Sequence, residues 1–368
     1  MLPKPLPPLC LAIGLIILSS WLSGCTTQVA SANLQGDAPA PAALEFCGTL
    51  ALPGEWQPLD DVSSVPLGGL SAMAWDSDEQ RLYLLSDRGR LHQATPVFRD
   101  GRLVDLTALS SHRLTDRDGR RLEGKAADAE SLVLMNDRDN VAGNTQLLVG
   151  FEQDHRVEGF TTTGVSSGRI IRSLLTASAA DNQSLEALAW VPGIGLVAGL
   201  EAPPTDMPQP PSDDVSSRHT LLFSLPGDDT PVTRWHYPLA PAPGSALTEL
   251  LTLEDAASTR SPRLLALERA FSPPHPLTIT LSLIELHQPP TVDVTRLASL
   301  SAGDGWRIDN MEGLARLPEG SILMVSDDNF SALQRNLLSC FRLRQDLADT
   351  PLPAGPPMSS DGPPAGDD

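Results

Sequence analysis

Hydrophobic residues in the central part of the chain fall into short runs separated by Gly, Pro, Asp and Ser. Within these runs, apolar and β-branched residues alternate or cluster, as in LTITLSLIEL at 277–286 and TVDVTRLASL at 291–300. This pattern is typical of β-strands. No long stretch of this region has the spacing of an amphipathic helix, so the sequence predicts an all-β fold.

The runs form an internal repeat in which two apolar strands are joined by a turn and the second strand ends at an acidic residue. The five copies span residues 68–89, 128–154, 182–201, 247–269 and 310–329. Two further strand-like runs follow each of the first four copies, which makes four strands per repeat of about 60 residues. Four strands repeated around a centre predict a β-propeller, with five blades favoured and six as the alternative.

The fifth repeat is one strand short, and residues 46–56 can supply it from the N-terminal side. The propeller would then cover residues 46–344 and close by pairing the two ends of the chain. Cys47 and Cys340 would lie on neighbouring strands of the shared blade, which predicts a disulfide in an oxidising compartment. The alternative is two buried free thiols.

Acidic residues recur at the same places in the repeats. Aligned first strands bring together Ser71, Glu130, Glu186, Glu249 and Glu312, and aligned second strands bring together Asp87, Glu152, Glu201, Glu268 and Asp327. In antiparallel strands, the start of one lies beside the end of the next. Both sets are therefore expected at one face of the propeller, where they would form an acidic funnel.

Many carboxylates in one funnel raise each other's pKa unless positive charge compensates. Compensation could come from arginines that follow the acids or from a hard divalent cation, for which Ca²⁺ is the first choice and Mg²⁺ the alternative. The catalytic candidates are Asp87, Arg88, Glu152, Arg156, Glu268 and Arg269, and the metal-ligand candidates are Asp327, Asp328, Glu130, Glu186, Glu201 and Glu312. In a structural alternative, the glutamates of the first strands accept backbone N–H bonds and lock neighbouring blades together. Ser71 is a further candidate, as a nucleophile.

The N-terminus has the features of an export signal. Lys4 precedes a short apolar run at 9–18, and the run leads into Leu22-Ser23-Gly24-Cys25, which resembles a bacterial lipobox. Residues 1–24 are therefore expected to be a signal peptide and Cys25 the lipidated first residue; an ordinary secretory signal is the alternative. Thr26 favours an outer-membrane anchor facing the periplasm. Residues 25–45 are expected to be a flexible linker and residues 345–368 a disordered Pro/Gly/Asp tail.

The formal net charge is −20, and the only lysines are Lys4 and Lys125. Such an acidic chain makes nucleic acid an unsuitable partner, because nucleic-acid binding needs a basic surface. Contact with the membrane is expected only through the lipid anchor, and a monomer is favoured.

Segments from both ends of the repeat region resemble the phytase-like esterase family of exported bacterial β-propellers. They are GGLSAMAWD, LYLLSDRG, DAESLVLM, LLVGFEQDHRV, QSLEALAWVPG and NMEGLARLPEGSILMVSDDNFSALQRNLLSCFRL. The resemblance implies a propeller and Ca²⁺-dependent hydrolysis of a small phosphoester or ester. Two hypotheses follow: a cation-dependent hydrolase acting at the acidic funnel, or a non-catalytic envelope lipoprotein whose propeller face binds a ligand or a protein.

Overall fold

The computed structural model describes residues 29–172, 185–203, 218–225, 232–253 and 261–344. The predicted signal peptide, Cys25 and the C-terminal tail lie outside these residues. The helical elements described are short, such as η1 (Gly124–Ala127) and η4 (Ala302–Asp304), and none has the length and apolar character to cross a membrane.

The strands form five four-stranded antiparallel blades, one of which carries an additional short edge strand. Blade 1 is β5 (Leu70–Asp76), β6 (Arg81–Ser86), β7 (Arg90–Arg99) and β8 (Arg102–Arg113). Blade 2 is β9 (Ala129–Met135), β10 (Gln146–Phe151), β11 (Arg156–Thr161) and β12 (Ser166–Ile171). Blade 3 is β13 (Leu185–Val191), β14 (Gly195–Leu200), β15 (His219–Ser224) and β16 (Arg234–Pro238). Blade 4 is β17 (Ser245–Thr252), β18 (Arg263–Ala270), β19 (Thr278–Leu286) and β20 (Val292–Ser301).

Blade 5 combines both ends of the domain. It contains β21 (Asn310–Arg316), β22 (Ile322–Asp327) and β23 (Leu337–Leu343), with β2 (Leu44–Ala51) as its fourth strand and β1 (Ala30–Ser31) at the edge. A separate hairpin of β3 (Glu55–Trp56) and β4 (Val65–Pro66) leads from β2 into blade 1.

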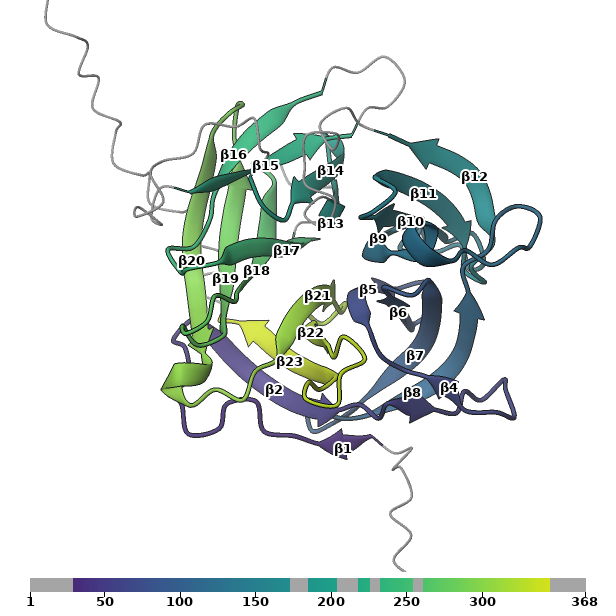
Figure 1. Cartoon of the computed structure of the whole chain (residues 1–368), viewed down its shortest axis with the longest axis horizontal. Coiled ribbons are helices and arrows are strands. Elements are labelled where there is room, and N and C mark those ends of the chain that lie inside the picture. Colours follow the sequence, from purple (N-terminus) through teal and green to yellow (C-terminus); the bar gives the residue numbers. More distant parts are fainter. Residues whose placement is uncertain (1–28, 173–184, 204–217, 226–231, 254–260, 345–368) are drawn as a thin grey trace, which may run out of the picture.

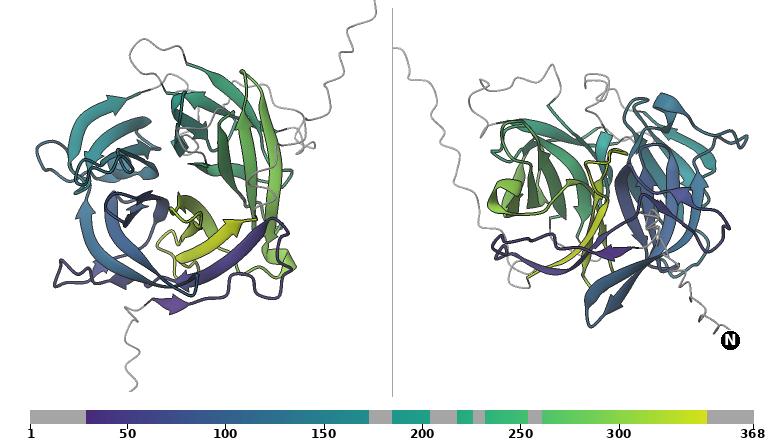
Figure 2. Two further views of the ribbon diagram at one scale, coloured as in Figure 1. Left: turned by 180° about the vertical axis from the view of Figure 1, so that it is seen from behind. Right: turned by 60° about the horizontal axis from the view of Figure 1, so that its bottom comes forward.

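The blades form a closed ring. The innermost strands β5, β9, β13, β17 and β21 contact one another in chain order, and β21 contacts β5 again. Both face views show these strands around the middle of the ring (Figure 1; Figure 2, left). Apolar side chains fill the space between neighbouring blades; Tyr83 and Leu85 of blade 1, for example, share a buried cluster with Val149 and Phe151 of blade 2. The prediction of five blades is confirmed.

The predicted closure is also confirmed. Strand β2 lies alongside β23 in antiparallel register, with Phe46 opposite Phe341 and Gly48 opposite Cys340 (Figure 1). The register shifts at Cys47, and Cys47 forms a disulfide with Cys340 across a Cα–Cα distance of 4.9 Å. Gly48 has a φ of +124°, and a Cβ there would lie 2.5 Å from the Leu103 carbonyl oxygen, so this bulge requires glycine.

The prediction of a flexible linker up to residue 45 is wrong for residues 29–45, the last two of which belong to β2. Strand β1 pairs with β2, and Leu34, Ala38 and Ala43 are buried in the cluster that joins blades 4 and 5. The Leu34 carbonyl also accepts a hydrogen bond of 2.8 Å from the Arg307 backbone N–H. Burial of these few apolar residues offsets the conformational entropy that is lost when a segment with the composition of a linker becomes ordered.

Candidate functional site

Each innermost strand has a one-residue β-bulge near its start. The register shifts place the bulged residue at Ser71, Glu130, Glu186, Thr248 and Glu312 in blades 1 to 5, respectively. A bulge inserts one unpaired residue and turns its side chain out of the normal alternation of the strand. The repeat in the sequence therefore corresponds to a β-bulge that recurs at the same end of every inner strand.

The second strands supply a matching set. In each second strand, one residue pairs with the residue just before the bulge. The next residue along the second strand is, in blades 1 to 5 respectively, Asp87, Glu152, Glu201, Arg269 and Asp327. In blade 4 the predicted alignment is thus wrong by one residue in both strands. Thr248, and not Glu249, occupies the bulge, and Arg269, and not Glu268, is the equivalent residue of the second strand. The physical reason is the bulge at Thr248, because Leu247 pairs with Glu268 and Glu249 pairs with Leu267.

The two displaced glutamates are held within the fold. Glu268 is buried, and its carboxylate accepts hydrogen bonds from the Tyr237 hydroxyl (2.6 Å), the Ala240 backbone N–H (2.6 Å) and the Ser245 hydroxyl (2.8 Å). Glu249 is also buried and accepts a 2.8 Å bond from the Leu250 backbone N–H. Glu249 therefore fits the structural alternative, and the contacts of Glu268 tie blade 3 to blade 4.

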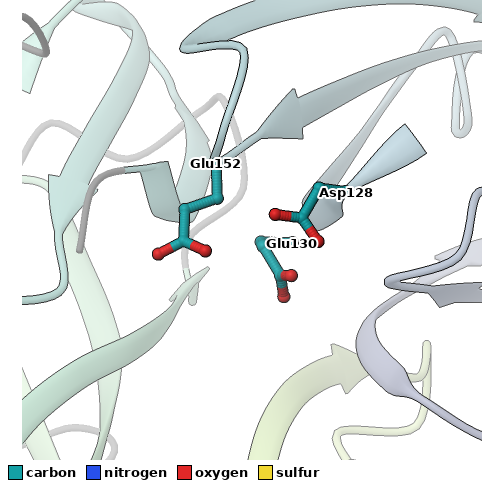
Figure 3. A group of neighbouring side chains, drawn as sticks. All are labelled: Asp128, Glu130 and Glu152. Carbon is teal, nitrogen blue, oxygen red and sulfur yellow. The ribbon is translucent and has the colours of Figure 1, made fainter. Parts of the chain in front are cut away.

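Acidic side chains converge most closely at blades 2 and 3. One carboxylate oxygen each from Asp128, Glu130 and Glu152 lie within 4.8 Å of one another, and the same holds for Glu152, Glu186 and Glu201. Figure 3 shows the three side chains of the first group close together. Asp128 is not among the candidates that the sequence predicts; its position directly before β9 is the signal that could have assigned it to the site.

Burial raises the pKa of Glu130, Glu186 and Glu312 well above the usual range. Their carboxylates also raise one another's pKa: Glu312 and Asp128 act on Glu130, and Glu130 and Glu201 act on Glu186. Glu312 accepts a 2.6 Å hydrogen bond from the Asn310 side-chain amide. Repulsion among the acidic carboxylates therefore joins Glu130, Glu186 and Glu312 of blades 2, 3 and 5 into one electrostatic unit.

Asp87 and Asp327 extend this unit to the junction of blades 5 and 1. Burial raises the pKa of Asp87 to about 6, against an opposing effect of Arg88. Burial also raises the pKa of Asp327 to about 7, although a hydrogen bond from the Asn329 backbone N–H (2.7 Å) acts in the other direction. We call the connected carboxylates the acidic site; its members are Asp87, Asp128, Glu130, Glu152, Glu186, Glu201, Glu312 and Asp327.

Arg269 brings positive charge into the acidic site from blade 4. Its guanidinium donates to Glu201 (2.9 Å) and to the Asn310 side-chain oxygen (2.7 Å), and it lies 3.6 Å from Glu312. Burial lowers the pKa of Arg269, but Glu312, Glu201 and Glu186 outweigh that effect and raise it. The predicted compensation by arginine therefore operates at Glu201 and Glu312.

Arg156 has a different environment from Arg269. Its buried guanidinium pairs with Glu158 (2.8 Å) and Asp154 (3.0 Å) and stacks on the Phe151 ring at 3.7 Å. It also donates a 2.9 Å bond to the carbonyl of Ala126, two residues before Asp128. Arg156 thus holds the segment that presents Asp128.

Arg88 and Asp328 belong to the junction of blades 5 and 1. Arg88 stacks on the Phe330 ring at 3.5 Å. Asp328 accepts hydrogen bonds from the backbone N–H groups of Gly69 and Phe330, both 3.0 Å, and from the Asn336 amide, 2.9 Å. Gly69 has a φ of +61°, and a Cβ there would collide with an Asp87 carboxylate oxygen, so glycine permits this close approach.

Ser71 occupies the bulge of blade 1, where other blades have glutamate. Its hydroxyl is buried and donates to the Gly69 carbonyl at 3.4 Å. No histidine among the described residues is hydrogen-bonded to it, which gives the nucleophile hypothesis no support from geometry.

The donor set of the acidic site suits a hard divalent cation. Such ions bind several carboxylate oxygens around one point, and the two groups within 4.8 Å offer that arrangement. Asp128 Oδ2 is buried and has no hydrogen-bond partner in the part of the chain that the structure describes. These acidic groups could therefore hold a metal ion.

The fold and the site together define a five-bladed β-propeller with an acidic site at one end of its channel. A model of the Phytase-like family, described as "Esterase-like activity of phytase", matches residues 65–330, and the chain belongs to that family. No curated protein matches the chain. Two solved structures that match are titled "glucose dehydrogenase" (16% identity, TM-score 0.35, covering 84% of this chain and 98% of that chain) and "Crystal structure of glucose dehydrogenase" (15%, 0.36, 84% and 99%).

Proposed function

We propose that this protein is an exported, lipid-anchored hydrolase that uses Ca²⁺ at the acidic site to cleave a small phosphoester or carboxylic ester. The observation that carries the proposal is the convergence of Asp128, Glu130, Glu152, Glu186 and Glu201. Membership of the Phytase-like family supports the reaction class. Mg²⁺ is the alternative ion.

Two overlapping carboxylate groups, which share Glu152, would hold the cation. When bound, it would neutralise carboxylate charge and polarise a phosphoryl or carbonyl oxygen. Arg269 lies beside this set and would contact an anionic oxygen of the substrate. Asp327, with a pKa of about 7, is suited to accept a proton from water near neutral pH.

Hydrolysis tests this proposal directly. In the presence of Ca²⁺ we expect turnover of at least one ester in a panel of p-nitrophenyl phosphate, bis(p-nitrophenyl) phosphate, p-nitrophenyl acetate and p-nitrophenyl butyrate. A chelator should abolish it, and Glu152→Gln should lower kcat/KM on the order of 10²-fold, because the variant loses the negative charge of the one carboxylate that belongs to both groups.

The matched control is Glu55→Gln, which changes an exposed glutamate of β3 and should leave turnover unchanged. No turnover of any ester in the panel, with Ca²⁺ still bound, would contradict hydrolysis and favour the alternative of a non-catalytic envelope protein that binds a ligand.

Lipidation is the second part of the proposal, with an outer-membrane anchor facing the periplasm. It rests on Cys25 and the residues before it, Leu22-Ser23-Gly24. We expect Cys25→Ser to move the protein from the membrane fraction to the soluble fraction, because one thiol carries the lipid. Cys47→Ser is the matched control and should remain with the membrane. Membrane fractionation of Cys25→Ser would argue against lipid anchoring.

A further inference from the structure

A cavity lies at the opposite end of the channel from the acidic site. Its volume is about 520 Å³, and its walls come from the ends of all five innermost strands and from turns such as Asn136–Asp139 and Pro192–Gly193. These turns join the first and second strands of blades 2 and 3, whereas the acidic site lies at the starts of the first strands. We call this space the end cavity.

One apolar side chain from each blade contributes to the end cavity. Two residues beyond the bulge, the inner strands carry Met73, Leu132, Leu188, Leu250 and Leu314, and all five border the cavity and are buried. No member of the acidic site borders it. The end cavity is therefore a site of its own, with chemistry opposite to that of the acidic site.

The positive and negative charges around the end cavity cancel one another. Asp137 pairs with Arg138 at 3.1 Å, and the rim also carries Asp139 and Arg316. Glu249 borders the cavity too; burial raises its pKa well above the usual range, which favours the neutral carboxyl. A lining without net charge offers no compensation to an ionic ligand and favours an uncharged one.

Two tryptophans indicate what the ligand would contact. Trp190 borders the cavity with 43% of its surface exposed, so part of its ring is accessible to a ligand. Trp75 borders it as well and is 91% buried (9% exposed), and its indole N–H has no hydrogen-bond partner among the described residues. A buried donor without a partner is costly unless an acceptor is supplied.

We infer that the end cavity binds one uncharged small molecule that has an apolar body and a hydrogen-bond acceptor, such as a ketone or ester oxygen. The volume is within the range of about 300–1,000 Å³ of small-molecule sites. The ligand would stack against Trp190 and accept a hydrogen bond from Trp75.

The test uses the fluorescent ketone 6-propionyl-2-(dimethylamino)naphthalene as the probe. The wild-type protein should bind one probe saturably, with a blue shift of its emission. Trp190→Ala should weaken binding about tenfold, because an aromatic contact of the ring is lost. Phe271→Ala is the matched control, since Phe271 is 63% exposed and follows β18, away from the end cavity; it should bind as the wild type does.

The hydrogen bond is tested with a second probe, 2-(dimethylamino)naphthalene, which lacks the carbonyl group. Trp75→Phe keeps a ring but removes the donor, so it should weaken binding of the ketone about fivefold and leave binding of the second probe unchanged. Trp75 also borders a smaller cavity near Pro96 and Phe98, and an equal effect on both probes would overturn the assignment of its N–H to this ligand.

Chelator and Glu152→Gln should not change either affinity, which separates this inference from the proposed hydrolysis. Absence of saturable binding, or binding that Trp190→Ala leaves unaffected, would overturn it.

Discussion

Replacing Cys47 and Cys340 together by alanine should lower the free energy of unfolding by about 5 kcal/mol. The disulfide spans a sequence separation of 293 residues and joins the two ends of the propeller within blade 5. A cross-link over so long a loop restricts the unfolded chain strongly, and its loss also weakens the pairing of β2 with β23, on which ring closure depends. Denaturant unfolding of the soluble domain, produced without its lipid, measures the change.

Reduction provides the control for the disulfide prediction. A reductant should destabilise the wild type by a similar amount and leave the double alanine variant unchanged. If the variant and the oxidised wild type unfold at the same denaturant concentration, hydrogen bonds and packing between β2 and β23 alone hold the ring closed.

Arg269→Gln should lower the free energy of unfolding by about 3 kcal/mol at pH 8 in the presence of chelator. Arg269 is the cation that contacts both Glu201 and Glu312, and its removal leaves buried carboxylates without that partner. Arg102→Gln, which changes an exposed arginine of β8, is the matched control and should have little effect.

The loss caused by Arg269→Gln should depend on pH. The pKa values of Glu201 and Glu312 are already raised in the folded protein, Glu201 chiefly by burial against the opposing effect of Arg269, and removal of Arg269 raises them further. The folded variant therefore binds protons at higher pH than the wild type does, and its deficit in stability is present above the folded pKa and shrinks as pH falls toward the ordinary value of 4.5. Equal losses at pH 4 and pH 8 would show that Arg269 acts by packing rather than by charge.

Much of the fold can be predicted from the sequence, because the sequence patterns that indicate it are local or repeated. Alternating apolar runs predict the strands, and the spacing of the acids predicts five blades. The cysteines mark the closure, since Cys47 and Cys340 make sense as a pair only if the two ends share a blade. Leu34 and Ala43 were missed because their burial depends on contacts with blades 4 and 5, which composition does not reveal.

The site is predicted less completely than the fold, because its residues depend on the register between paired strands. The segment Leu247-Thr248-Glu249 offers two ways to align blade 4, and only the paired strands show that Thr248 occupies the bulge. Whether an arginine faces the channel or its own blade also depends on tertiary contacts: Arg269 meets Glu201, whereas Arg156 meets Glu158 and Asp154. The sequence could therefore identify the acids as a class but not separate potential ligands such as Glu152 from structural acceptors such as Glu268.

Calorimetric titration of the chelator-treated protein with Ca²⁺ measures whether the carboxylates of blades 2 and 3 form a divalent-cation site. The wild type should bind Ca²⁺ and gain about 2.7 kcal/mol of stability at a hundredfold excess over the dissociation constant. Asp128→Asn combined with Glu152→Gln should remove both the binding heat and the gain, while Glu55→Gln retains them. If the wild type shows neither Ca²⁺ binding nor a change in melting temperature, or if the double variant binds as the wild type does, the carboxylates of blades 2 and 3 are a structural network and not a cation site.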